Sequence, residues 1–289
     1  MRKEELKKVY LATIDTVNDG YYEIVDGEEE EVVSIMDEET MCQGTEFYGK
    51  KVSIQDIDSL KKYDTTVIVE NNDCLVAAKG FIDEGLRPCV LNMASFHTPG
   101  GGVLNGSKAQ EEDIFRRTNI FKSLYQFSPI GDEFGVEQKE EQYPLERTYG
   151  AIYTPNVTVF KNGVDKGYSF LKTPFQIDVI SCAAVKNPTL VDGKLPKWAA
   201  ELMTEKIRQI FNISLVHGND SLILSAFGCG AYKNPPHDIA AIFKKVIEEF
   251  DKCFKKISFA ILELEGTSFK EHNPNGNLVP FQEVLQQKM

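Results

Sequence analysis

The chain contains the stretch His97-Thr-Pro-Gly-Gly-Gly-Val-Leu-Asn-Gly-Ser-Lys-Ala-Gln-Glu-Glu-Asp113, in which seven residues separate three glycines from a glutamine and two glutamates. The apolar residues 88–94 before this stretch predict a buried strand. Residues 113–124 after it carry apolar side chains at close to helical spacing, which predicts a helix. The sequence therefore predicts a strand, a glycine-rich loop and a helix whose start carries two carboxylates.

The glycines and the glutamates suggest two chemical roles, phosphate binding and proton transfer. Glycine lets backbone N–H groups come close to a phosphate, and the start of a helix adds partial positive charge. The two glutamates would place proton-transfer groups beside that phosphate. The sequence thus indicates a phosphorylated sugar or a nucleotide as substrate. Both features also have an explanation without a function. The glycines could form a surface turn, and the glutamates could lie in a solvated first helical turn, where the helix dipole favours carboxylates.

A P-loop is the nearest competing motif, because Gly101 and Gly106 have the glycine spacing of that motif. In a P-loop the lysine comes directly after the second glycine and reaches the β- and γ-phosphates. Here Ser107 precedes Lys108, so the order is reversed. The sequence therefore does not favour a P-loop.

Three glycines followed by six to eight residues and Gln-Glu-Glu resemble the signature of the poly(ADP-ribose) glycohydrolases. The match is complete at 100–102 and 110–112. A second segment, Leu222–Pro236, contains Phe-Gly-Cys-Gly-Ala-Tyr and resembles the second diphosphate loop of that family. Its spacing and the stretch Lys3–Tyr22 are most similar to the microbial-type branch. The resemblance covers nearly the whole chain and is weakest over Gly131–Thr148.

The resemblance implies roles for individual residues. Glu112 would be the general acid that protonates the leaving ribose oxygen, and Glu111 would position the leaving ribose. Asn92 and Ser95 match strand-end positions that face the ribose, although Ser95 replaces the asparagine of the animal enzymes. The diphosphate would lie between the two glycine loops, with Tyr232 packing on the distal ribose. The substrate-binding residues implied are Asn92, Ser95, Gly100, Gly101, Gly102, Val103, Gln110, Gly228, Cys229, Gly230, Ala231 and Tyr232.

The implied activity is hydrolysis of the ribose–ribose O-glycosidic bond with release of ADP-ribose, with no metal or cofactor. Two alternatives stay open: removal of single ADP-ribose units from protein or nucleic acid, and a non-catalytic ADP-ribose-binding module. Both glutamates are present, which favours an enzyme, because a binding module needs no acid. Cys229 is not favoured as a nucleophile, since no histidine motif accompanies it and His237 lies beyond two prolines.

Composition limits the partners. The net charge of −12 argues against a generic nucleic-acid-binding surface and against long-range attraction of a polyanion. The six cysteines form no Cys-x-x-Cys pair, which is typical of reduced core residues and not of a zinc site. Residues 1–8 contain no apolar signal region and no apolar run is long enough to cross a membrane, so we expect neither a signal peptide nor a membrane span. We expect a cytoplasmic monomer whose partners are ADP-ribose and poly(ADP-ribose) on modified proteins.

Alternating apolar strands and amphipathic helices predict a layered α/β domain. The resemblance implies a three-layer, macrodomain-like mixed sheet between helices, with an N-terminal helical extension over 1–62 on a catalytic core over 63–289. An acidic turn is expected at 26–31 and a surface excursion at 131–148. The expected strands are 32–35, 65–70, 88–94, 151–160, 176–185, 222–227 and 257–264. The expected helices are 3–18, 74–83, 113–124, 198–216, 239–250 and 281–287.

Overall fold

The structure is a computed structural model that describes residues 1–26, 29–35, 38–264 and 271–286. The chain forms two compact units that alternate along the sequence. Unit 1 consists of Met1–Phe47, Ala94–Leu145 and Ile152–Ser181, and unit 2 of Tyr48–Met93, Glu146–Ala151 and Cys182–Met289. The expected extension 1–62 thus contributes to both units. Within the described part of the chain, every helix is too short or too polar to span a lipid bilayer.

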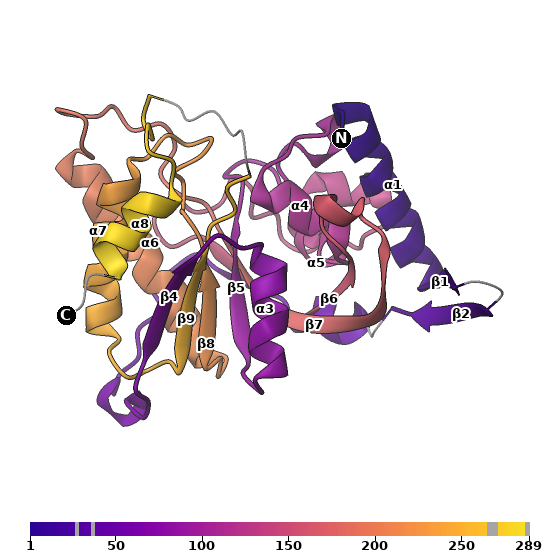
Figure 1. The fold of residues 1–289 in the computed structure, drawn as a ribbon, viewed down its shortest axis with the longest axis horizontal. Helices are drawn as coiled ribbons and strands as arrows, with labels where there is room; N and C mark the ends of the chain where they lie inside the picture. The colour runs from indigo at the N-terminus through magenta and orange to yellow at the C-terminus, as the bar shows by residue number, and fades with distance from the viewer. Residues whose placement is uncertain (27–28, 36–37, 265–270, 287–289) are drawn as a thin grey trace. The chain divides into compact units, whose positions relative to one another are not determined.

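The elements follow the expected α/β pattern (Figure 1). Those of unit 1 are α1 (Lys3–Asp19), β1 (Tyr21–Asp26), β2 (Glu29–Ser34), α2 (Glu38–Gln43), β3 (Glu46–Tyr48), η2 (Val103–Asn105), α4 (Gln110–Arg117), α5 (Phe121–Leu124), η3 (Tyr125–Phe127), η4 (Pro129–Phe134), β6 (Ala151–Lys161), η5 (Val164–Lys166) and β7 (Phe170–Cys182). Those of unit 2 are η1 (Asp58–Leu60), β4 (Thr66–Glu70), α3 (Cys74–Asp83), β5 (Pro88–Met93), α6 (Lys197–Val216), β8 (Ser221–Leu224), α7 (Pro236–Glu249), β9 (Lys256–Ala260) and α8 (Leu278–Leu285).

The seven-stranded sheet has the strand order β3-β6-β7 in unit 1 and β5-β8-β9-β4 in unit 2. The unit 2 strands are parallel (Figure 1). Cys89 pairs with Leu222, which pairs with Ile257. Helix α3 packs on β5 and β8, and α8 packs on β4. Strands β5 and β8 are almost entirely buried, as expected for parallel strands covered by helices. The expected fold class, a mixed sheet flanked by helices, is confirmed.

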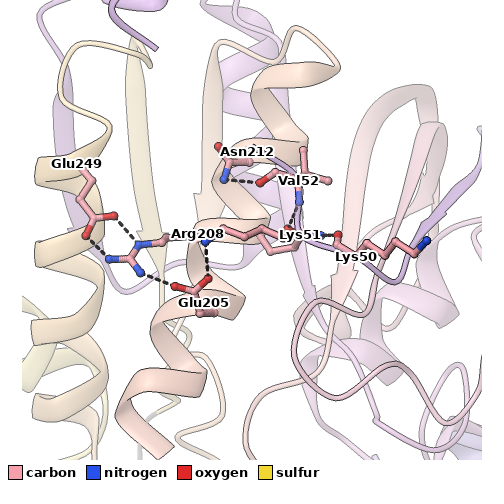
Figure 2. A network of polar contacts seen from close by, with 8 residues as sticks. Lys50, Lys51, Val52, Glu205, Arg208, Asn212 and Glu249 are labelled. Atoms are coloured by element: carbon pink, nitrogen blue, oxygen red, sulfur yellow. Dashed lines mark hydrogen bonds and ion pairs between the residues drawn. The ribbon is translucent and has the colours of Figure 1, made fainter. Parts of the chain in front are cut away.

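Segment 50–52 of unit 2 is fixed to α6 by a polar network (Figure 2). The Val52 N–H donates to Gln209 Oε1 at 2.9 Å, and Asn212 Nδ2 donates to the Val52 carbonyl at 3.0 Å. On the same helix, Arg208 makes two 2.6 Å hydrogen bonds to the Glu249 carboxylate. These contacts join the extended segment, α6 and α7 within unit 2.

Several expected boundaries are confirmed and explained by local chemistry. Helix α3 starts after Asp73, whose Oδ1 accepts the N–H groups of Leu75 and Val76 at 2.9 and 3.0 Å. Helix α1 ends at Gly20, which has a φ of 78°. Its inner face buries Leu6, Tyr10, Thr13, Ile14 and Val17. The last expected helix, 281–287, appears as α8, and residue 287 lies outside the described residues.

Six expectations about the elements are wrong. The strand expected over 176–185 runs over Phe170–Cys182, and the strand expected over 222–227 ends at Leu224. Residues 26–31 do not form only a turn, because Tyr21 pairs with Ser34 in a β1–β2 hairpin; residues 27–28 lie outside the described part. The helix expected over 113–124 starts at Gln110 and breaks after Arg117, where Thr118 bridges to Val159. The strand expected over 257–264 ends at Ala260. The segment 131–148 is not simply a surface excursion, because Val136, Tyr143 and Leu145 are buried.

Candidate active site

The glycine loop of unit 1 is bonded to both glutamates of α4. The Gly100 N–H donates to Glu111 Oε1 at 3.0 Å, and the Ser95 N–H donates to Glu111 Oε2 at 2.7 Å. The Gly102 N–H donates to Glu112 Oε1 at 2.9 Å. The loop therefore holds both carboxylates at the first turn of α4, where the helix dipole also favours negative charge.

The two carboxylates differ in the hydrogen bonding of one oxygen atom. Glu112 Oε2 is buried, and among the described residues it has no hydrogen-bond partner. The whole Glu112 side chain is only 7% exposed. A buried carboxylate oxygen without a donor is the position where a proton, or a donor from a ligand, would be most stabilised.

The structure explains why three glycines are needed. A Cβ at Gly100 would lie 2.6 Å from the Phe115 ring, and one at Gly102 would lie 2.3 Å from Ser107 Oγ. Gly101 has a φ of +53°, and its Cβ would lie 2.7 Å from Glu112 Oε1 and 2.9 Å from Glu111 Oε2. Side chains are excluded here because the carboxylates pack directly against the loop backbone.

The N–H groups of this loop already have acceptors inside unit 1. Besides the bonds to the glutamates, the Gly101 N–H donates to the Thr98 carbonyl at 3.1 Å. The Val103 N–H donates to the Gly100 carbonyl at 3.0 Å. A diphosphate at this loop would have to share these donors with the protein.

The structure gathers most of the residues singled out around this loop in unit 1. Ser95 is half-buried, and its Oγ accepts the N–H groups of His97 and Thr98 at 3.3 and 3.4 Å. Val103 is buried at the start of η2, and Gln110 is the first residue of α4. Asn92 belongs to unit 2, where it is fully buried in β5.

Tyr143 approaches Glu111 from the segment 131–148. Its side chain is 5% exposed, and within the described residues its hydroxyl has no hydrogen-bond partner. Burial raises the pKa of Tyr143 well above its ordinary value, and the nearby Glu111 and Tyr125 add to this effect. The residue therefore stays a neutral phenol beside the paired glutamates. Sequence reasoning missed it because its surroundings are acidic and rich in turns.

The second glycine loop lies in unit 2 and has a tight turn at Gly228. Its φ is +76°, and a Cβ there would lie 2.6 Å from Ala184 Cβ and 2.7 Å from Asn234 Nδ2. Asn234 Nδ2 donates to the carbonyls of Val185 and Gly228 at 2.8 and 3.0 Å. Sequence reasoning missed Asn234, although an asparagine before two prolines is a turn signal.

This second loop offers backbone donors. Among the described residues, the N–H groups of Gly228, Gly230 and Ala231 have no acceptor. Gly230 and Ala231 are also exposed. The Cys229 N–H differs, because it donates to the Ala226 carbonyl at 3.0 Å. Exposed, unpaired N–H groups next to a helix start are suited to an anion.

Cys229 does not present a nucleophile. Its side chain is fully buried, and burial raises the pKa of its thiol well above the ordinary value. The thiol is 3.8 Å from the Phe227 carbonyl, and the Cys229 carbonyl lies 2.7 Å from His272 Nε2. A neutral, enclosed thiol cannot attack a substrate at this loop.

Tyr232 closes the second loop and is half-buried. Its carbonyl accepts the Asn187 N–H at 2.9 Å, and Lys186 Nζ lies 5.8 Å from the centre of its ring. The Tyr232 ring is thus partly accessible, and the Lys186 ammonium group lies over it. In the described part of the chain, His, Cys, Asp and Glu side chains form no group of three or more that could hold a metal ion.

The fold and the site define a mixed α/β protein that presents two buried glutamates on a glycine loop. The family model for the microbial-type PARG catalytic domain matches residues 11–162, which is more than half of the chain and includes both glutamates. The chain belongs to this family of poly(ADP-ribose) glycohydrolases (PARG). The second glycine loop lies outside the matched segment.

Solved structures have the same fold. A poly(ADP-ribose) glycohydrolase from Thermomonospora curvata is 23% identical, with a TM-score of 0.78 over 98% of this chain and 100% of that chain. The same enzyme bound to the inhibitor ADP-HPD is 23% identical, with a TM-score of 0.75 over 97% and 99%. The Deinococcus radiodurans enzyme in complex with ADP-ribose is 24% identical, with a TM-score of 0.62 over 86% and 96%. No curated protein sequence matches the chain.

Proposed function

We propose that this protein is a poly(ADP-ribose) glycohydrolase that cuts ribose–ribose O-glycosidic bonds and releases ADP-ribose. The observation that carries the proposal is the carboxylate of Glu112, which has one oxygen fixed by the Gly102 N–H and the other buried with no partner in the described part of the chain. A group held in this way can give up and take back a proton without moving. Membership of the family supplies the substrate class.

In the proposed reaction, Glu112 starts protonated and transfers its proton to the 2′-oxygen of the leaving ribose. The bond from that oxygen to the anomeric carbon breaks, and an oxocarbenium-like centre develops. Water then attacks this carbon, and the Glu112 carboxylate takes the proton that the water loses. The carboxyl group is thereby restored for the next cycle.

Glu111 is proposed to position the leaving ribose, together with Ser95. Both Glu111 oxygens accept an N–H group, so both of them already serve to hold the loop at Ser95 and Gly100. The same two bonds tie the loop residues Ser95 and Gly100 to α4 within unit 1. The division of work between adjacent glutamates thus has a geometric basis.

The second loop is proposed to bind the diphosphate of ADP-ribose through the N–H groups of Gly228, Gly230 and Ala231, which have no acceptor among the described residues. Tyr232 would pack its ring on the distal ribose. Backbone donors suit a protein of net charge −12, which cannot attract a polyanion over a long range. We further propose that the fold is a macrodomain and that the protein acts as a cytoplasmic monomer on ADP-ribosylated proteins.

Incubation with polymer attached to an automodified ADP-ribosylating enzyme tests the proposal. We expect free ADP-ribose to appear, and the Glu112→Gln variant to release none above background. Mono-ADP-ribosylated protein and nucleic acid serve as parallel substrates. Cleavage of these alone would favour a mono-ADP-ribosyl hydrolase, and binding without any cleavage would favour a binding module.

A further inference from the structure

Arg116 is an unusual residue in unit 1, because its side chain is fully buried on the same helix as the two glutamates. Its guanidinium bonds to backbone carbonyls and not to a carboxylate. Nε donates to the Leu6 carbonyl at 3.1 Å, and Nη2 donates to the Ser107 carbonyl at 2.5 Å. Nη1 is buried and has no hydrogen-bond partner within the described residues.

Burying a cation in this way is costly. A charge removed from water costs several kcal/mol unless a counter-charge and hydrogen bonds offset it. Two carbonyls and the neighbouring Tyr168 hydroxyl, which donates to Asp113 Oδ1 at 2.7 Å, offset only part of that cost. An apolar side chain of similar volume would serve stability at least as well, so the guanidinium calls for a further explanation.

The hydrogen bonds give that explanation, because they form a circuit that begins and ends on α4. Arg116 bonds to the Ser107 carbonyl, and the Ser107 N–H donates to the Gly102 carbonyl at 3.1 Å. The Gly102 N–H in turn donates to Glu112 Oε1 at 2.9 Å. Arg116 stands four residues after Glu112, so one helical turn carries both ends of the circuit.

Helix α1 supports the circuit from two positions. Gly106 fits directly against the start of α1, since a Cβ there would lie 2.2 Å from the Lys3 carbonyl. One helical turn further on, the Leu6 carbonyl accepts the Arg116 Nε–H. Beyond it, the Thr13 hydroxyl donates to the Arg116 carbonyl at 2.6 Å. The turn 102–107 is therefore held between α1 and α4.

We propose that Arg116 is a positioning residue for Glu112, acting through Ser107 and Gly102, and that α1 is its support. This inference deepens the proposed function and rests on it for its kinetic consequence. A misplacement of about 1 Å can cost roughly 10²-fold in turnover. Lysine cannot replace arginine here, because a single ammonium does not reproduce the fork that reaches Leu6 and Ser107 together.

Arg116→Lys is the test, and Arg117→Lys is the matched control. Arg117 is buried on the same helix, but its guanidinium bonds to Asp113 Oδ2 at 2.9 Å and to the Lys161 carbonyl at 3.3 Å, away from the loop. We expect kcat to fall about 10- to 100-fold in Arg116→Lys. KM for polymer and Kd for ADP-ribose should change less than about threefold, which is under roughly 0.7 kcal/mol. The control should keep wild-type kcat with a similar loss of thermal stability.

A second readout does not need activity. Amide hydrogen exchange at Gly102 and Ser107 should be slow in the wild type and in Arg117→Lys, and at least about tenfold faster in Arg116→Lys. Equal protection in all three proteins would overturn the proposal, as would an unchanged kcat in Arg116→Lys. If Arg116→Lys does not fold, hydrogen exchange in the wild type still tests the proposal. Rapid exchange at Gly102 would show that the circuit of hydrogen bonds does not hold this loop. An inactive wild type with slow exchange would refute the proposed function and leave the circuit standing.

Discussion

Glu111 and Glu112 are neighbours on α4, yet within the described residues Glu111 accepts an N–H group on each oxygen and Glu112 on only one. The first glutamate is fully engaged in holding Ser95 and Gly100. Glu112 keeps one buried oxygen that is available for proton transfer. This asymmetry separates a positioning carboxylate from an acid, although nothing in the two residue types distinguishes them.

Glu112→Gln should abolish turnover while leaving ligand binding intact. The amide keeps the volume and can still accept the Gly102 N–H, but it has no proton to transfer. General acid–base catalysis is typically worth about 10²–10⁴-fold, so kcat should fall by that range. Calorimetry should give an ADP-ribose affinity close to that of the wild type. Release of ADP-ribose at the wild-type rate would show that Glu112 is not the acid.

Glu111→Gln should impair both binding and turnover. Its new NH₂ group must face the N–H of either Ser95 or Gly100, so one of two hydrogen bonds is lost and two donors oppose each other. An unsatisfied buried donor costs about 1–3 kcal/mol, which should appear as a lower melting temperature and a higher KM. Wild-type values for both quantities would contradict this role.

Gly101→Ala should damage catalysis through the carboxylates. The new methyl group would lie 2.7 Å from Glu112 Oε1, at a φ of +53°. Gly167→Ala is a control of equal backbone strain, because Gly167 has a φ of +61° and open space around its Cβ position. We expect backbone strain to cost both variants about 1 kcal/mol or more in stability, and the close contact with the carboxylates to add a further loss in Gly101→Ala. Only Gly101→Ala should lose kcat, and equal activity of the two would refute the packing argument.

Tyr232 should act through its ring. Tyr232→Phe should keep most of the activity, because the ring and its contact with Lys186 remain. Tyr232→Ala should weaken ADP-ribose binding by roughly tenfold, since a partly buried aromatic contact is worth about 1 kcal/mol or more. Tyr21→Ala, an exposed tyrosine of β1, serves as the control. Binding by calorimetry that is equal in all these proteins would remove Tyr232 from the site.

The buried Lys161 predicts how the stability of the folded protein depends on pH. Burial lowers the pKa of Lys161 to about 8, whereas an unfolded lysine titrates near 10.4. Between these values the unfolded chain binds more protons, so this group makes stability rise as the pH rises from about 8 to 10. Below pH 8 the buried ammonium is a cost, offset in part by its 2.8 Å bond to Thr13 Oγ1.

Lys161→Met should therefore be more stable than the wild type at pH 7, by about 1–3 kcal/mol in urea unfolding. That difference should shrink as the pH approaches 10. Lys166→Met, at an exposed lysine of the same unit, should change little at any pH. A constant difference between Lys161→Met and the wild type across this range would show that the Lys161 charge is not the cause.

The sequence was most informative where one local signal decides the outcome. The expected helices 74–83 and 3–18 have local signals at their ends, because Asp73 caps the start of α3 and Gly20 ends α1. The triple glycine and the paired glutamates predicted a loop that runs into a helix, and the structure has that order. Such signals act between residues close in the chain, so they can be read without knowing the fold.

Contacts between distant residues could not be predicted in this way. Helix α4 stops at Arg117 because Thr118 bridges to Val159, which is 41 positions away in the sequence. Tyr143 is buried although acidic residues precede it. The partners of Arg116 are carbonyls at positions 6 and 107, and a carbonyl has no signature in a sequence. The roles of these residues depend on tertiary structure alone.

The enclosed thiol of Cys229 gives the second glycine loop a chemical reporter of its own motion. Alkylating reagents can reach this sulfur only when the turn opens, because its side chain is fully shielded. Cys42, which is partly exposed, serves as the reference thiol within the same chain. The ratio of the two labelling rates therefore measures how often the loop opens, and a molecule that clamps the loop will lower it.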